Sequence, residues 1–193
     1  MNSEFTLQER MDAAFDNYLR LSKILRDDMN ALLDSENNTQ PWRRNFIRAS
    51  AALIEGHAHC LRDMCAVSFD CVAPEITTKE SDVLRLEKSF DTNERIKLTL
   101  RVAYKLFELE PAPNFGGSEW PTAQQVLTKR HLPMHPKIPA DLEIPDDLWT
   151  TLRKDVTWLF EQLFSFLSLL EKKHAGLPNN QTSPITSSPR RWQ

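Results

Sequence analysis

Residues 129–137, KRHLPMHPK, hold the side chains of this chain that are best suited to catalysis, with two lysines, one arginine and two histidines within nine positions. A histidine near its ordinary pKa of about 6.5 can accept or donate a proton at neutral pH. A guanidinium can hold a phosphate through two parallel hydrogen bonds and stabilise charge that develops on its oxygens. Arg130 and His135 therefore fit the cleavage of RNA, which supplies its own nucleophile, the 2′-hydroxyl, and requires no metal ion or other cofactor.

A plainer interpretation of the same residues is an exposed basic loop that follows a helix, with a histidine capping a helix terminus. An arginine and a histidine at this spacing often occur together by chance, so the spacing alone favours the plainer interpretation. Pro133 lies between Arg130 and His135. Because proline cannot occupy a regular helix interior, we expect no regular helix through this stretch, and the two side chains need not share a helical face.

The prolines also show where the elements that position these residues can form. Residues 1–40, 42–73, 75–110 and 146–177 contain no proline, and apolar residues recur there at spacings of three and four. The sequence therefore predicts an all-α fold, a helical bundle of about five main helices. These helices are expected at about residues 3–34, 43–69, 95–108, 118–130 and 146–172, with a shorter helix at 79–88 and Thr92 as an N-cap.

Two of the expected helices have distinctive surfaces. The helix at 43–69 carries many small residues between positions 49 and 58, which allow other helices to approach closely, so we expect it to be central. The last helix carries an apolar seam, which indicates either deep burial or half of a subunit interface. The seam residues are Leu148, Leu152, Val156, Leu159, Leu163, Phe166 and Leu170.

Length and composition set further limits. The 193 residues favour one domain over 1–175, with a long N-terminal helix at 3–34 and a flexible tail at 176–193 that is rich in proline, serine, asparagine and threonine. A net charge of -3 gives no global attraction to nucleic acid, so any affinity for phosphate must be local. With no signal-peptide pattern, no apolar run that could span a membrane and three cysteines that form no disulfide framework, we expect a soluble cytoplasmic protein.

The order of helices and the letters around the basic stretch resemble the HEPN superfamily. Its signature is an arginine, a polar residue, a few more positions and a histidine, which Arg130, His131 and His135 match. The segment from Pro136 into the acidic start of the last helix also resembles bacterial members. The residues that match the family specifically are confined to 126–149. The order of the helices extends the resemblance over a HEPN-like core at 42–172.

The resemblance implies a metal-independent endoribonuclease of a bacterial toxin–antitoxin or antiphage system, with RNA as substrate, a homodimer as the working unit and an antitoxin or other defence protein as a partner. Arg130 would engage the scissile phosphate, His135 would act as general acid or base, and His131 would orient one of them or contact RNA. Lys129 and Lys137 would add positive charge for the RNA backbone. The alternative is a catalytically silent HEPN-like module that dimerises through the last helix or binds a protein partner.

Other polar residues have both a functional and a structural interpretation. Glu55, His59 and Arg62 share one polar edge of the second helix and are candidates for a second layer around the site, although surface ion pairs are the simpler explanation. His57 aligns with apolar residues, which favours a core histidine. The cluster of Arg43, Arg44 and Arg48 would extend an RNA surface, but solvated charges at a helix start are the preferred interpretation. The histidines and cysteines do not form a four-ligand metal pattern.

Overall fold

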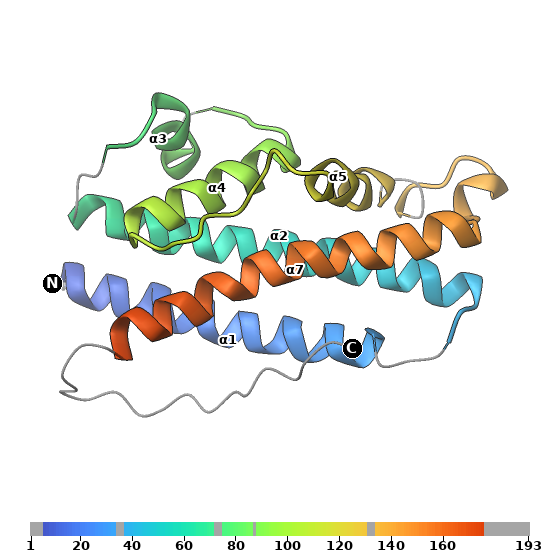
Figure 1. The fold of residues 1–193 in the computed structure, drawn as a ribbon, viewed down its shortest axis with the longest axis horizontal. Helices are drawn as coiled ribbons and strands as arrows, with labels where there is room; N and C mark the ends of the chain where they lie inside the picture. The colour runs from blue at the N-terminus through green and yellow to red at the C-terminus, as the bar shows by residue number, and fades with distance from the viewer. Residues whose placement is uncertain (1–5, 34–36, 72–74, 87, 131–133, 176–193) are drawn as a thin grey trace, which may run out of the picture.

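The protein folds as an all-α bundle, as the sequence predicts. A computed structural model describes residues 6–33, 37–71, 75–86, 88–130 and 134–175. In these ranges there are six α-helices, one 3₁₀-helix and no β-strand (Figure 1). They are α1 (Leu7–Leu33), α2 (Gln40–Cys71), α3 (Thr78–Arg85), α4 (Thr92–Leu106), α5 (Glu119–Lys129), η1 (Pro139–Leu142) and α7 (Asp146–Ala175).

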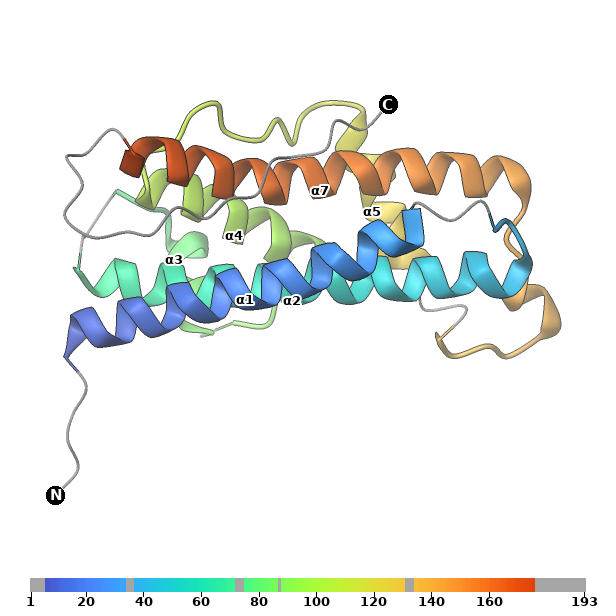
Figure 2. The ribbon, with the colours of Figure 1, turned by 90° about the horizontal axis from the view of Figure 1, so that it is seen from below.

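Helix α2 is the centre of the bundle, as its small residues predict. It contacts α1, α3, α4, α5 and α7. Figures 1 and 2 show α1, α2 and α7 as long helices that run along the molecule, with α3, α4 and α5 grouped on one side of them. The starts of α2 and α7 and the segment 134–145 lie at the same end of the bundle, so this end gathers parts of the chain that are about 100 residues apart.

Local capping explains where the shorter helices begin. Thr77 forms a capping box with Glu80, in which each side chain accepts a hydrogen bond from the other residue's backbone NH. The N-cap of α4 is Asp91, one residue before the expected Thr92. The Asp91 side chain accepts a hydrogen bond from the backbone NH of Glu94. The prediction of Thr92 as N-cap was therefore wrong. Asp91, directly before it, offers a carboxylate, which also opposes the positive end of the helix dipole.

The apolar seam of α7 is part of the core of the single chain. Leu152, Val156, Leu159, Leu163 and Phe166 are all fully buried, at 0% exposure. Of the two sequence interpretations, the structure thus supports deep burial, and the seam is not available as a subunit interface. The neighbouring apolar side chains Trp158, Phe164 and Leu167 are partly buried and also pack against this core.

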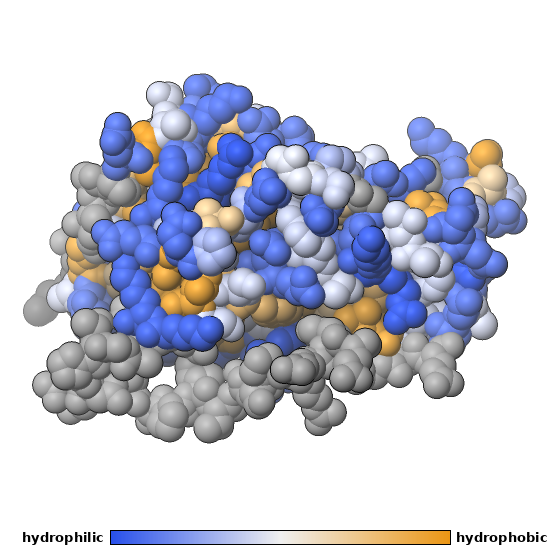
Figure 3. Space-filling view, in the orientation of Figure 1, coloured by the Kyte–Doolittle hydropathy of each residue, from blue (hydrophilic) through white to orange (hydrophobic). Residues whose placement is uncertain are grey.

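The face of the bundle that Figure 3 shows, which includes α4 and α7, is largely hydrophilic and is broken by smaller apolar patches. None of the helices that the structure describes is both long and apolar enough to cross a membrane. The predicted flexible tail at 176–193 lies outside the described residues.

Candidate functional site

Arg130 lies directly after the last residue of α5 and is held against the central helix. Its Nη1 forms an ion pair with Oε1 of Glu55 on α2. The pair is partly open to solvent, with 18% of the Arg130 side chain and 31% of the Glu55 side chain exposed. A guanidinium has five N–H donors in a rigid plane, so one contact through Nη1 can orient it while other donors stay open to an anion. The structure thus brings together Arg130 and one of the three candidate second-layer residues.

His135 lies in an exposed part of the chain shortly after Arg130. The backbone NH of Met134 donates to the carbonyl of Arg130 at 3.2 Å. The two residues are four positions apart, as in the hydrogen bonds of an α-helix. This contact limits how far His135 can move from the end of α5. Lys129 is half-buried and Lys137 is exposed. His131 and Pro133 lie outside the described residues.

A compact turn follows His135. The carboxylate of Asp141 accepts hydrogen bonds from the backbone NH of Lys137 at 2.8 Å and of Ile138 at 3.1 Å. These two bonds favour the ionised form and lower the pKa of Asp141, with the Lys137 bond the larger cause. Arg44 of α2 then donates to the carbonyl of Leu142 at 2.9 Å. The segment after His135 is therefore folded on itself and bound to α2.

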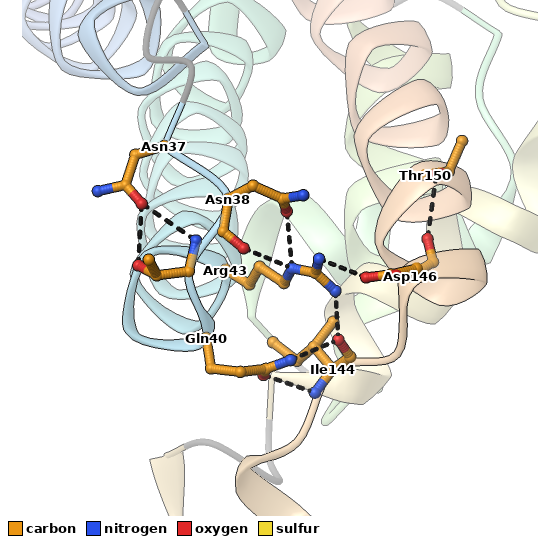
Figure 4. Close-up of polar contacts among 8 residues, drawn as sticks. Asn37, Asn38, Gln40, Arg43, Ile144, Asp146 and Thr150 are labelled. Carbon is orange, nitrogen blue, oxygen red and sulfur yellow. Dashed lines mark hydrogen bonds and ion pairs between the residues drawn. The ribbon is translucent and has the colours of Figure 1, made fainter.

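A buried arginine in the first turn of α2 also holds this segment. Arg43 is only 5% exposed and donates to the carbonyl of Ile144 at 2.6 Å and to Asp146 Oδ1 at 2.5 Å (Figure 4). Its Nε bonds to Asn38, through the carbonyl oxygen and the side-chain Oδ1. Gln40 completes the cluster, because its amide both donates to the carbonyl of Ile144 and accepts from the NH of Ile144, each at 2.9 Å.

This cluster corrects the sequence interpretation of the arginines at the start of α2. Arg43 is not a solvated charge, because its Nε, Nη1 and Nη2 bind Asn38, the Ile144 carbonyl and Asp146, and Arg44 donates through Nη1 to the carbonyl of Leu142. Arg48 is exposed and bonds to Asn45 at 3.3 Å. It shares one face of α2 with Glu55, since seven residues make nearly two turns. The signal that identifies Arg43 lies in the tertiary contacts, because nothing in the local sequence distinguishes it from its neighbours.

The remaining second-layer candidates form a separate group on α2, in which His59 is exposed and Arg62 is buried. Arg62 Nη2 lies 2.8 Å from His59 Nδ1 and donates to Asp63 Oδ1 at 2.8 Å. His59 Nε2 lies 3.4 Å from Asp63 Oδ2. Among the described residues, neither His59 nor Arg62 contacts Arg130 or His135. The simpler interpretation, an ion-pair group along one helix, describes these two residues.

His57 lies in the core, as its apolar register predicts. It is fully buried, and its ring meets Tyr18 and Phe164 edge-on at centroid distances of 5.0 and 5.3 Å. Neither ring nitrogen has a hydrogen-bond partner among the described residues. Burial therefore disfavours the charged imidazolium and lowers the pKa of His57 from 6.5 to about 4. This histidine is a structural feature of the α1–α2–α7 contact and lies apart from Arg130.

The site has no metal cluster in the part of the chain that the structure describes, where no three histidine, cysteine, aspartate or glutamate side chains are grouped to hold an ion. Comparisons of the chain with protein-family models, with curated proteins and with solved structures give no match. The structure thus defines an all-α bundle in which the partly exposed Arg130 follows the last residue of α5 and the exposed His135 comes five positions later.

Proposed function

We propose that this protein is a metal-independent endoribonuclease that uses Arg130 and His135. The observation that supports this most is the Arg130–Glu55 ion pair, which holds a partly exposed guanidinium through Nη1. Its other N–H groups are the donors proposed for a phosphate. His135, exposed and five positions further along, supplies an imidazole, a side chain suited to general acid–base catalysis.

The residues suit an internal phosphoryl transfer. The 2′-oxygen of the ribose attacks the adjacent phosphorus, the bond to the 5′-oxygen of the next nucleotide breaks, and a 2′,3′-cyclic phosphate and a 5′-hydroxyl result. One proton leaves the 2′-hydroxyl and one reaches the leaving oxygen, and His135 performs one of these transfers. Arg130 stabilises the charge on the non-bridging oxygens. Lys129, Lys137 and His131 remain the proposed contacts of the RNA backbone.

The resemblance to HEPN proteins motivates the wider proposal of a bacterial toxin–antitoxin or antiphage role, with an antitoxin or other defence protein as partner. We place any dimer contact on a surface other than the α7 seam, because six of the seven seam residues are buried within one chain and Leu148 is partly buried.

An RNA cleavage assay in EDTA tests the proposal directly. Wild type should cleave single-stranded RNA, and His135→Ala and Arg130→Ala should each lower kcat/KM by about 100-fold or more. His59→Ala is the matched control, because His59 is also an exposed histidine but contacts Asp63 instead. Circular dichroism should show the same helical content in all four proteins.

Two outcomes would contradict the proposal: undiminished cleavage by His135→Ala, or wild-type protein that leaves every RNA intact. The second result would favour the alternative, a catalytically silent helical module. That alternative has lost one of its motivations, since the apolar seam of α7 is occupied by the core of its own chain.

A further inference from the structure

The two halves of the proposed site are attached to one helix at two separate points. Glu55 of α2 holds Arg130, while Arg43 and Gln40, at the start of the same helix, hold Ile144. Twelve residues separate Arg43 from Glu55, so the two attachment points lie roughly 18 Å apart along the helix axis. The rigid helix therefore fixes the distance between the ends of the stretch that contains His135.

The stretch between these points is much longer than the distance it bridges. From Arg130 to Ile144 an extended chain would reach roughly 46 Å at 3.3 Å per residue. Attachment of the two ends alone would thus leave His135 a wide range of positions. Additional bonds must remove this freedom if His135 is to act at a defined place.

The described contacts form a series that leads from α2 to Lys137, two residues after His135. Arg43 fixes Ile144 and the start of α7 through Asp146, and Arg44 fixes Leu142. Asp141 next binds the backbone NH groups of residues 137 and 138. On the other side of His135, the Met134 NH bonds to the Arg130 carbonyl. No such bond is found for residues 135 and 136 among the described residues of this segment.

Arg43 contacts more residues than any other member of this series. It is the most buried of the polar residues in the cluster, and its guanidinium lies 5.7 Å from the Trp149 ring centroid in addition to its hydrogen bonds. The guanidinium of Arg43 thus binds Asn38 in the loop before α2 and residues 144–146 at the start of α7, and it holds these two chain segments together. The first turn of α2 is therefore built to fix the segment that carries His135.

We infer that Arg43 is a positioning residue of the site, which sets the place of His135 relative to Arg130 through residues 137–146. This inference rests on the proposed function for its catalytic consequence, but its structural part is independent of activity. Arg43 itself does not touch the substrate, because its donors are already taken by protein oxygens.

Arg43→Lys tests the inference, because lysine keeps the positive charge but loses the planar set of donors. Hydrogen exchange should become faster in peptides that cover 134–145, including the Ile144 amide, while peptides within α4 keep the wild-type rate. In the RNA assay, kcat should fall by about tenfold or more with a nearly unchanged KM, and the pH dependence of kcat/KM should keep the same pKa values. Arg20→Lys, at an exposed position of α1, is the matched control and should change neither readout.

If Arg43→Lys unfolds the protein, Gln40→Leu removes two of the bonds to Ile144 and leaves Arg43 in place. Unchanged exchange over 134–145 would overturn the inference, and so would faster exchange with wild-type kcat. If the wild-type protein has no RNase activity, the proposed function is refuted, and so is the catalytic effect inferred for Arg43. The exchange data would then show on their own whether Arg43 fixes the segment.

Discussion

The buried histidine His57 makes a prediction about stability and pH that follows from its surroundings. Its pKa is lowered to about 4 in the folded protein, against 6.5 for a free histidine. Below pH 6.5 the unfolded chain binds a proton at this position more readily than the folded chain does. Stability should therefore be complete near pH 7, fall as the pH drops through 6.5, and stop falling for this reason below about pH 4.

The magnitude follows from the difference between the two pKa values. At 1.36 kcal/mol per pKa unit, His57 should lower the free energy of unfolding by about 2 kcal/mol at pH 5 and by about 3 kcal/mol near pH 4. His57→Leu replaces the imidazole with an apolar side chain of similar size and removes two unpartnered nitrogens. This variant should be as stable as wild type or more stable at pH 7, because a buried unsatisfied polar group costs about 1–3 kcal/mol.

Urea unfolding, followed by tryptophan fluorescence from pH 7 to pH 4, measures both effects. The difference between wild type and His57→Leu should grow as the pH falls, since the other titrating groups contribute equally to both proteins. His59→Leu is the control, because His59 lies on the same helix but its side chain is 61% exposed. A pH profile of wild type that parallels His57→Leu between pH 6.5 and pH 4 would refute the reasoning.

Two further predictions concern α7. Asp155 is buried with Oδ2 unpartnered among the described residues, and burial raises its pKa, so Asp155→Asn should raise the free energy of unfolding at pH 7. This gain should shrink as the pH falls through the Asp155 pKa, and urea unfolding at several pH values would show it; a gain that stays constant with pH would count against the argument. Leu163→Ala, at a fully buried seam position, should cost about 2–5 kcal/mol by urea unfolding. Leu167→Ala, at a partly buried neighbour, should cost less, and equal losses would contradict the assignment of the seam to the core.

Much of the fold is predictable from the sequence because helix formation is mainly local. Apolar spacing, proline-free windows and cap residues are all properties of neighbouring residues, and they predict the helices to within a few residues. For example, the last helix was expected over about 146–172 and extends over Asp146–Ala175. The small residues of α2 also predict its central position, because close helix packing depends on side-chain size.

The contacts of charged side chains are far less predictable. Arg43, Arg44 and Arg48 look alike in the sequence, yet the structure buries the first, binds the second to the Leu142 carbonyl and leaves the third exposed. Their environments depend on where residues 142–146 pack, about 100 positions later in the chain, and no local sequence pattern predicts this. Similarly, the seam of α7 looks the same whether it meets its own core or a second chain.

The sequence by itself thus determined the helices, the centrality of α2 and the concentration of basic residues and histidines at 129–137. Only the tertiary structure decided that Arg130 meets Glu55, that His59 and Arg62 form a separate group, and that Arg43 binds the segment after His135. The physical reason is the range of the interactions. Helix formation depends on residues within about one or two turns, whereas the partner of a side chain depends on which distant segment packs beside it.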